Sequence, residues 1–229
     1  MDARLTFRPA NEVPFDDLEA VLGTGTAGRC QCQRQVLADR EWWYLPVEER
    51  AHRLREQTNP DDPDAPTTSG VIAYLDDEPA GWVAVAPRTT YRRVAHSGVA
   101  WKGRSEDKQD ARVWAAVCLV VRKGYRGEGL TYELARAAVD FARERGAAAL
   151  EAYPITSRDG GRIIWDEASY GSPQAFAAAG LEQVSAPTVR RRTPPTECAI
   201  RGSSGRRVRG HRGPHQPRSG HPCMRCSGR

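Results

Sequence analysis

Residues 117–134 read VCLVVRKGYRGEGLTYEL, and this stretch decides the fold. The apolar run 113–121 stops abruptly, three glycines follow within six residues, and an amphipathic segment begins at Leu130. A continuous apolar run is typical of a strand covered on both faces. The apolar spacing after Leu130 predicts a helix that ends at Gly146. A second apolar run, 148–154, completes a strand–helix–strand unit, whose two strands we expect to be parallel neighbours.

The glycine turn predicts an anion site. Backbone N–H groups at the start of a helix, unobstructed by Cβ atoms, suit a phosphate or pyrophosphate. A P-loop would need Gly-Lys-Ser/Thr, but Gly129 is followed by Leu130, and the third glycine of a dinucleotide fingerprint would fall on Tyr132. The pattern Arg-x-x-Gly-x-Gly/Ala remains, and residues 126–131 fill it with Thr131 in the last slot.

The rest of the chain alternates short strands and helices. Hydrophobic periodicity and turn residues predict the following elements. They are a strand at 4–10, a helix at 15–22, a loop at 23–28, a charged helix at 47–57, a loop at 59–70, a hairpin at 71–88, an irregular loop at 89–110, a helix at 172–179 and a last strand from Leu181.

Charge divides the chain into two parts. The net charge is +5 over 229 residues, yet residues 1–189 hold 23 basic and 28 acidic side chains, whereas residues 190–229 hold 11 arginines and one acid. No apolar run is long enough to span a bilayer, and the first residues carry no signal core. We therefore expect a cytoplasmic protein whose six cysteines are mostly reduced.

The last forty residues are rich in Arg, Gly, Pro and Ser, which predicts disorder. Their arginines could bind nucleic acid or another polyanion. A second hypothesis is that the chain from about residue 192 is a frameshifted extension of a GC-rich gene. Neither Cys30 and Cys32 nor the Cys-x-x-Cys at 223–226 has a matching partner set, so we expect no metal.

Four stretches resemble the GNAT superfamily of N-acetyltransferases: LVVRKGYRGEGL, the helix after it, LEAYP, and AFAAAGLEQV. The resemblance covers residues 4–189 and is nearest to an uncharacterised bacterial branch. It implies an α/β (α+β) fold with a mixed, centrally splayed sheet flanked by helices. The domain would span 1–189, with 190–229 as a tail. The implied activity is acetyl-CoA-dependent transfer of an acetyl group to the amine of a small molecule or peptide, by a monomer or homodimer.

The resemblance also implies which residues bind acetyl-CoA, the acetyl donor. Backbone groups of Leu119, Val120 and Val121 would pair with the pantetheine arm of acetyl-CoA as if it were an added strand. Main-chain amides would hold the pyrophosphate, and these belong to Arg126, Gly127, Glu128, Gly129, Leu130 and Thr131.

The catalytic positions depart from the family pattern. The strand position that often carries a carboxylate falls near Cys118, and the usual tyrosine position is Phe176. Acetyl transfer still needs a base, an oxyanion donor and a proton for the leaving thiolate. The candidates that replace the missing groups are Glu151 as base, Tyr153 or Tyr170 as acid, Asp166, and the amide of Val121 for the oxyanion.

Three further side chains are candidates for the acceptor pocket, namely Trp82, Arg88 and Trp165. Two alternatives to an active transferase stay open. One is a GNAT-like domain that binds acyl-CoA with little or no transfer, which the two departures favour. The other is a polyanion-binding protein that acts through its arginine-rich tail.

Overall fold

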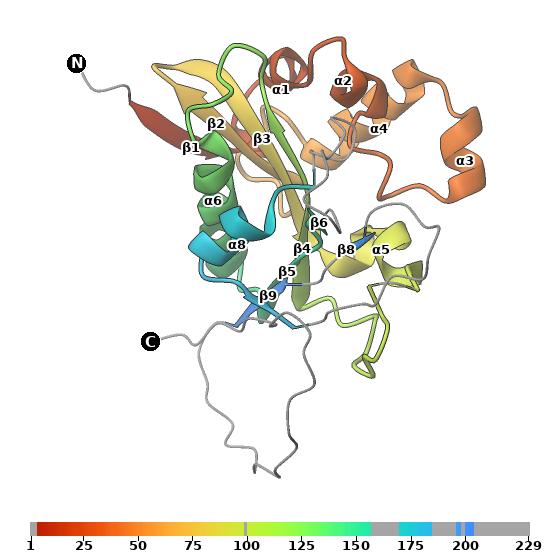
Figure 1. The fold of residues 1–229 in the computed structure, drawn as a ribbon. Helices are drawn as coiled ribbons and strands as arrows, with labels where there is room; N and C mark the ends of the chain where they lie inside the picture. Colours follow the sequence, from red (N-terminus) through yellow and green to blue (C-terminus); the bar gives the residue numbers. More distant parts are fainter. Residues whose placement is uncertain (1–3, 99, 157–169, 185–195, 198–199, 204–229) are drawn as a thin grey trace.

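Strand β4 (Val113–Val121) lies in the middle of a seven-stranded sheet in the computed structural model (Figure 1). The structure describes residues 4–98, 100–156, 170–184, 196–197 and 200–203. The strand order is β1-β2-β3-β4-β5-β9-β7, and β6 pairs with β8 in a separate two-stranded sheet. Neighbouring strands of the large sheet are antiparallel except β4 and β5, which are parallel as predicted. The mixed α/β architecture expected from the sequence is confirmed.

The remaining elements have the following bounds. The strands are β1 (Leu5–Pro9), β2 (Gly70–Leu75), β3 (Glu78–Pro87), β5 (Ala149–Ala152), β6 (Ile155–Thr156), β7 (Glu182–Gln183), β8 (Thr196–Glu197) and β9 (Ile200–Ser203). The helices are α1 (Phe15–Leu22), α2 (Thr26–Cys30), α3 (Asp39–Tyr44), α4 (Val47–Thr58), α5 (Arg92–His96), α6 (Leu130–Glu144) and α8 (Pro173–Ala178), with short 3₁₀ helices η1 (Ala10–Glu12) and η2 (Arg88–Thr90).

The predicted hairpin is formed by β2 and β3 around Asp76 and Asp77. Both residues have positive φ, 50° and 66°, as a two-residue turn between twisted antiparallel strands requires. Asp76 also ties the turn to β1, because its amide donates to Arg4 O (3.0 Å) and its carboxylate accepts from the Arg4 amide (2.8 Å). The first three strands are therefore fixed in one register.

Helices cover both faces of the sheet (Figure 1). On one face, α6 and α8 pack over a cluster that includes Leu134, Phe141 and Phe176. On the other face, α1 and α4 pack over a cluster that includes Leu18, Leu54 and Trp82. Among the residues that the structure describes, every helix is too short or too polar to span a bilayer.

Helix α6 ends as its sequence predicts. Gly146 has φ of +77°, and the amide of Ala147 donates to Ala142 O at 2.9 Å. This arrangement satisfies a carbonyl of the last turn and stops the helix.

Three short helices were not predicted. α2 lies partly in the expected loop 23–28, α5 lies in the expected loop 89–110, and α3 had no prediction. Helices of five or six residues are too short to show a periodic pattern, and tertiary contacts stabilise them instead. In α2, for example, a Cβ on Gly28 would lie 1.7 Å from Gly23 O, so close backbone packing fixes this helix.

Part of the arginine-rich tail is structured. Within the described part of the tail, β9 pairs with β5 and β7, and β8 pairs with β6. The open edge of β5 offers unpaired backbone groups, and Ile200 is a residue type that favours strands. The remainder of the tail lies outside the described residues, as do Trp165 and Asp166.

Gly70 tests the packing of the hairpin. A Cβ there would lie 2.1 Å from Val83 O and 2.6 Å from the Trp82 ring. We expect Gly70→Ala to lower the free energy of unfolding by about 2 kcal/mol, because a rigid strand and a buried indole would have to move. Chemical denaturation measures the change. Gly98→Ala is the matched control, since its Cβ would meet no atom within 4 Å, and equal stability of the two variants would contradict the prediction.

Candidate functional site

β4 is longer than its partner β5, and this difference opens the sheet. Val113 to Ala116 pair with Ala149 to Ala152, and no further pairs join the two strands. β5 stops two residues before Pro154, which has no amide hydrogen to continue the ladder. From residue 117 onward, the β4 edge that would face β5 therefore has no strand partner among the described residues.

The backbone of this edge presents groups from alternate residues. The amide of Arg122 donates to Ala80 O of β3 at 2.9 Å. Because hydrogen-bonded and non-hydrogen-bonded pairs alternate along an antiparallel ladder, the backbone groups of Val120 also point toward β3. Those of Leu119 and Val121 then point to the opposite, open edge. Arg126 reaches this edge, where its Nε donates to Val121 O at 3.0 Å.

A β-bulge at Val117 changes which side chains share a face. Ala84 pairs with Cys118 and Val85 pairs with Ala116, so Val117 is the extra residue on β4. Consequently Val117 and Cys118, although consecutive, both pack against the cluster under α1 and α4. The next residue, Leu119, packs on the α6 face. The bulge thus places a thiol beside the point where β4 and β5 separate.

The turn between β4 and α6 uses three glycines in the left-handed half of conformational space. Gly124, Gly127 and Gly129 have φ of +103°, +94° and +76°, and a Cβ on any of them would meet no atom within 4 Å. Within the described part of the chain, no side chain caps the start of α6. An open, uncapped helix start of this kind is suited to an anion.

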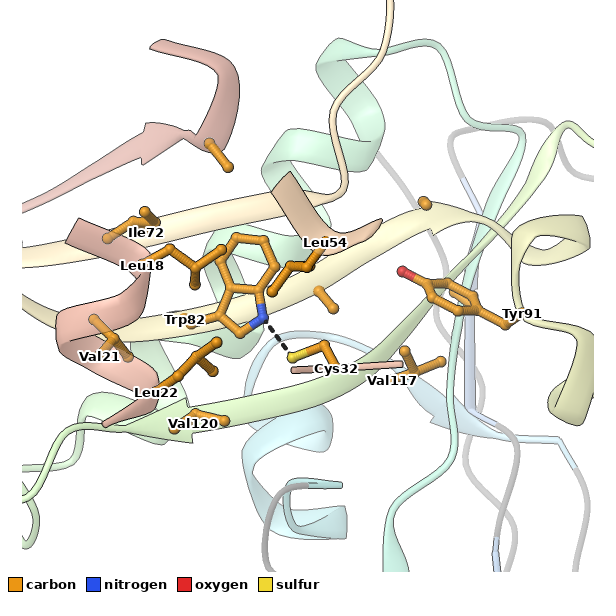
Figure 2. Packing of buried hydrophobic residues seen from close by; sticks show 14 of the residues in the cluster. Leu18, Val21, Leu22, Cys32, Leu54, Ile72, Trp82, Tyr91, Val117 and Val120 are labelled. Atoms are coloured by element: carbon orange, nitrogen blue, oxygen red, sulfur yellow. Dashed lines mark hydrogen bonds between the residues drawn. The ribbon is translucent and has the colours of Figure 1, made fainter. Parts of the chain in front are cut away.

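Polar side chains from three segments gather on the α1 side of β4. Cys32 follows α2, and its Sγ lies 3.4 Å from Cys118 Sγ. Trp82 donates its indole N–H to Cys32 Sγ at 3.2 Å (Figure 2). Burial, followed by the charges that the two thiols would carry, raises the pKa of Tyr91 well above its usual value. Tyr91 therefore keeps its proton.

Tyr170 belongs to the same region. Its hydroxyl accepts a hydrogen bond from Gln35 Nε2 at 2.8 Å, and the ring is half-buried. The next residue, Gly171, lies against β4, because a Cβ on it would be 3.5 Å from Leu119 Cδ1. Gln35 thus fixes the direction of the Tyr170 hydroxyl, and the residue after Tyr170 packs near the Leu119 side chain of β4.

Glu151 and Tyr153 form a buried ionic cluster instead. Arg88 Nη1 and Arg104 Nη2 donate to Glu151 Oε1 at 3.1 and 2.6 Å, and the Tyr153 hydroxyl donates to Oε2 at 2.5 Å. Arg88 and Glu151 have no exposed side-chain surface. Both guanidinium groups also stack on Trp101. Every acceptor on the carboxylate is occupied by a protein donor, so Glu151 is held as an anion.

The pKa shifts in this cluster follow from the same contacts. Burial raises the pKa of Tyr153 well above its usual value, and the negative charge of Glu151 raises it further. For Arg104, burial acts to lower the pKa, but the charge and hydrogen bond of Glu151 outweigh it and raise the pKa overall. Tyr153 therefore stays neutral and Arg104 stays charged across the physiological range.

The model of the acetyltransferase (GNAT) family matches residues 35–159 of this chain. This match covers more than half of the sequence, and it includes the open β4 edge and the glycine turn. The chain belongs to the GNAT family. No curated protein sequence matches it.

Several solved structures are similar to this chain. A candidate phosphinothricin N-acetyltransferase is 17% identical with a TM-score of 0.50, covering 87% of this chain and 98% of its own. YncA of Salmonella typhimurium, a candidate acetyltransferase solved with acetyl-CoA, is 13% identical with a TM-score of 0.47 and covers 87% and 93%. An N-acetyltransferase of Staphylococcus aureus is 11% identical with a TM-score of 0.49 and covers 87% and 98%.

This GNAT chain carries Cys118 and Phe176 at the two positions where the family pattern described above often has a carboxylate and a tyrosine. Phe176 is fully buried under α6 and has no polar atom. The hydrogen bond that Cys118 shares with Cys32, then burial, raises the pKa of Cys118 well above its usual value, so the thiol is protonated at neutral pH and is no base. Within the described ranges, no three His, Cys, Asp or Glu side chains are grouped so that they could bind a metal ion.

Sequence reasoning missed Gln35, Tyr91 and Arg104. Each lies in a segment without periodicity, and its role depends on contacts with residues far along the chain, for example the 135 positions that separate Gln35 from Tyr170. Arg88 and Trp82, which were expected at the acceptor pocket, are fully buried in the ionic cluster and in the core. Nothing in the local sequence distinguishes these arrangements from a surface arginine or an exposed indole.

Glu151→Gln tests the ionic cluster. The substitution removes the charge that balances Arg88 and Arg104, so we expect the free energy of unfolding to fall by about 3 kcal/mol or more. Glu133→Gln is the matched control, because Glu133 pairs with Arg136 on the exposed face of α6 and should change stability by less than about 0.5 kcal/mol. Urea denaturation of both variants would measure the difference, and a wild-type midpoint for Glu151→Gln would refute the structural role.

Proposed function

We propose that this protein transfers an acetyl group from acetyl-CoA to the amine of a small molecule or peptide. The observation that carries the proposal is the open edge of β4 leading directly into an uncapped glycine turn. An extended amide-containing arm can pair with the edge, and a pyrophosphate can lie against the turn, in the order that coenzyme A requires. Membership of an acetyltransferase family supports the acetyl thioester as donor.

The donor contacts can be assigned residue by residue. Backbone groups of Leu119 and Val121 lie on the open edge and would pair with the pantetheine arm. Val120 has its backbone directed at β3 and packs its side chain under α1. The amides of Arg126 to Thr131 would hold the pyrophosphate, and Arg126 would exchange or share its contact with Val121 O.

Tyr170 is the proposed proton donor. The amine nitrogen attacks the thioester carbonyl, the carbon–sulfur bond breaks, and the leaving sulfur must receive a proton. Because the Tyr170 hydroxyl accepts from Gln35, its own proton is directed away from Gln35. By contrast, the Tyr153 hydroxyl is already committed to Glu151, and Glu151 to two arginines. These two candidates are therefore proposed to stabilise the site rather than to move protons.

No carboxylate lies on β4 to deprotonate the amine. The proposal therefore requires the acceptor to bind as the neutral amine or to lose its proton to water. The amide of Val121 is the proposed oxyanion donor, since it points to the open edge. A preformed backbone donor needs no change of charge during the reaction.

Gly129→Glu tests the donor site. The new carboxylate would stand where the pyrophosphate is proposed to lie, so we expect the dissociation constant for acetyl-CoA to rise at least 100-fold, as measured by isothermal titration. Gly103→Glu is a matched control, because Gly103 has the same φ of +76° and equally open surroundings but lies outside the turn. Unchanged affinity in Gly129→Glu would refute the assignment of the turn.

Tyr170→Phe tests the proton donor. We expect kcat to fall at least tenfold without a change in the dissociation constant for acetyl-CoA, because only the step that protonates the thiolate is affected. Tyr132→Phe, an exposed tyrosine on α6, should leave kcat unchanged. Thiol release measured over a panel of primary amines provides both values. An undiminished kcat in Tyr170→Phe would show that another group protonates the leaving thiolate.

The second candidate function is an acyl-CoA-binding domain with little or no transfer. The fully buried Phe176 and the protonated Cys118 favour it, because neither can serve as acid or base. Tight binding of acetyl-CoA without thiol release on any amine would support this candidate. Polyanion binding by the tail concerns residues that lie mostly outside the described ranges, and deletion of 204–229 tests it separately.

A further inference from the structure

Two thiols from distant parts of the chain meet on the acceptor side of β4. Cys32 and Cys118 are 86 positions apart in sequence, and their sulfur atoms are 3.4 Å apart. A disulfide bond is about 2.05 Å long, so the sulfurs would have to approach by roughly 1.4 Å. Both are free thiols, with Cys32 buried and Cys118 partly exposed.

The backbone at Cys32 is held in a conformation that directs the thiol to β4. Gln31 and Cys32 have φ of 50° and 52°, a left-handed conformation that is uncommon for two consecutive non-glycine residues. Two hydrogen bonds fix this turn. The side-chain Nε2 of Gln31 donates to Gly28 O at 2.8 Å, and the backbone N–H of Gln31 donates to Ala27 O at 2.9 Å. Conformations of this kind persist only where the surrounding structure holds them.

Buried side chains surround the two sulfurs. Figure 2 shows Cys32 accepting the indole N–H of Trp82 from one side, with Val117 and Tyr91 nearby. The Tyr91 hydroxyl is buried and has no hydrogen-bond partner among the described residues. A polar group left unsatisfied in the core costs stability, and Tyr91 belongs to the same buried cluster as Cys32, against which Cys118 packs.

We propose that Cys32 and Cys118 are a peroxide-oxidisable pair that forms an internal disulfide and fastens the segment after α2 onto β4. Peroxide first oxidises the more accessible Cys118 thiol to a sulfenic acid and is itself reduced, with release of one water. The Cys32 sulfur then attacks the Cys118 sulfur, the S–O bond breaks, and a second water leaves. One peroxide is reduced and two thiols are oxidised in the complete reaction.

The disulfide would also change the acceptor side. Its formation shortens the distance between the segment that carries Gln35 and the bulge of β4, next to Tyr170. The effect on acetyl transfer rests on the proposed function, whereas the formation of the bond does not. Because the raised pKa of Cys118 keeps its thiol protonated, oxidation will need peroxide in excess and will be slower than for an exposed thiol.

Peptide mapping of the full chain tests the bond directly. Trypsin releases Cys30 and Cys32 together in CQCQR (30–34) and Cys118 in VWAAVCLVVR (113–122). After peroxide treatment and alkylation without reductant, we expect these two peptides to be joined, with the mass of their sum less two hydrogens plus one alkyl group on Cys30. Dithiothreitol should separate them. Two separately alkylated peptides after treatment would overturn the proposal.

Three serine variants identify the partners. Cys30→Ser should still give the joined peptides, while Cys32→Ser and Cys118→Ser should not. Cross-linking that survives in Cys32→Ser would assign the bond to Cys30 and refute the pair. If a variant fails to fold, thermal unfolding of the oxidised and reduced wild-type protein still tests for the disulfide. A bond that closes a loop of this length should raise Tm by roughly 5 °C or more, and reductant should reverse the rise.

A second readout separates this proposal from the proposed function. If the protein transfers acetyl groups, the oxidised wild type should lose at least tenfold in kcat and recover with reductant, and Cys32→Ser should keep its own rate under peroxide. A rate that is insensitive to complete cross-linking would refute the effect on transfer. If no amine is acetylated at all, the proposed function fails while the joined peptides still decide the disulfide.

Discussion

The unequal lengths of β4 and β5 are the constraint on which the site depends. The two strands pair over four residues, and β4 then continues alone to Val121. A parallel strand whose edge is left open must satisfy its backbone groups in another way, and in this chain Arg126 satisfies one of them. The bulge at Val117 and the glycine turn lie on either side of this opening. The end of the β4–β5 pairing, the bulge at Val117 and the start of α6 therefore all lie within about a dozen residues.

The polar side chains near β4 and β5 are held by interactions of different strength. Glu151, Arg88 and Arg104 are buried together, where each charge compensates another and none is available to a ligand. Gln35 and Tyr170 share a neutral hydrogen bond, in which Gln35 donates to the Tyr170 hydroxyl. A buried ionic cluster gives orientation and stability but little chemical freedom, because moving a proton from it would leave unpaired charge in the core.

The sequence predicted the parts of the molecule that depend on local pattern. The apolar run 113–121, the amphipathic α6, the glycine turn and the Asp-Asp hairpin are all visible as periodicity or turn residues, and the structure contains each of them. Family resemblance added the arrangement of the sheet.

The side chains of the site could not be predicted in the same way. The ionic cluster around Glu151, which the sequence suggested as a base, could not be predicted because its partners Arg88 and Arg104 lie 63 and 47 positions away. Tyr91 and Gln35 lie in segments where short helices form through tertiary contacts rather than through a repeating pattern. Which buried polar groups meet is a property of the packed molecule, and one sequence does not encode it in any local spacing.

The pairing of β9 with β5 has a consequence for solubility. β9 is contributed by residues 200–203, and it covers an edge of β5 that β7 does not reach. A chain that stops before residue 200 would leave the whole β5 edge uncovered, without a lysine or proline to interrupt it. Bare edges of this kind pair with other chains, so shortened forms of this protein should self-associate even where their core folds correctly. Residues 200–203 thus cover the β5 edge against intermolecular strand addition, independently of any ligand.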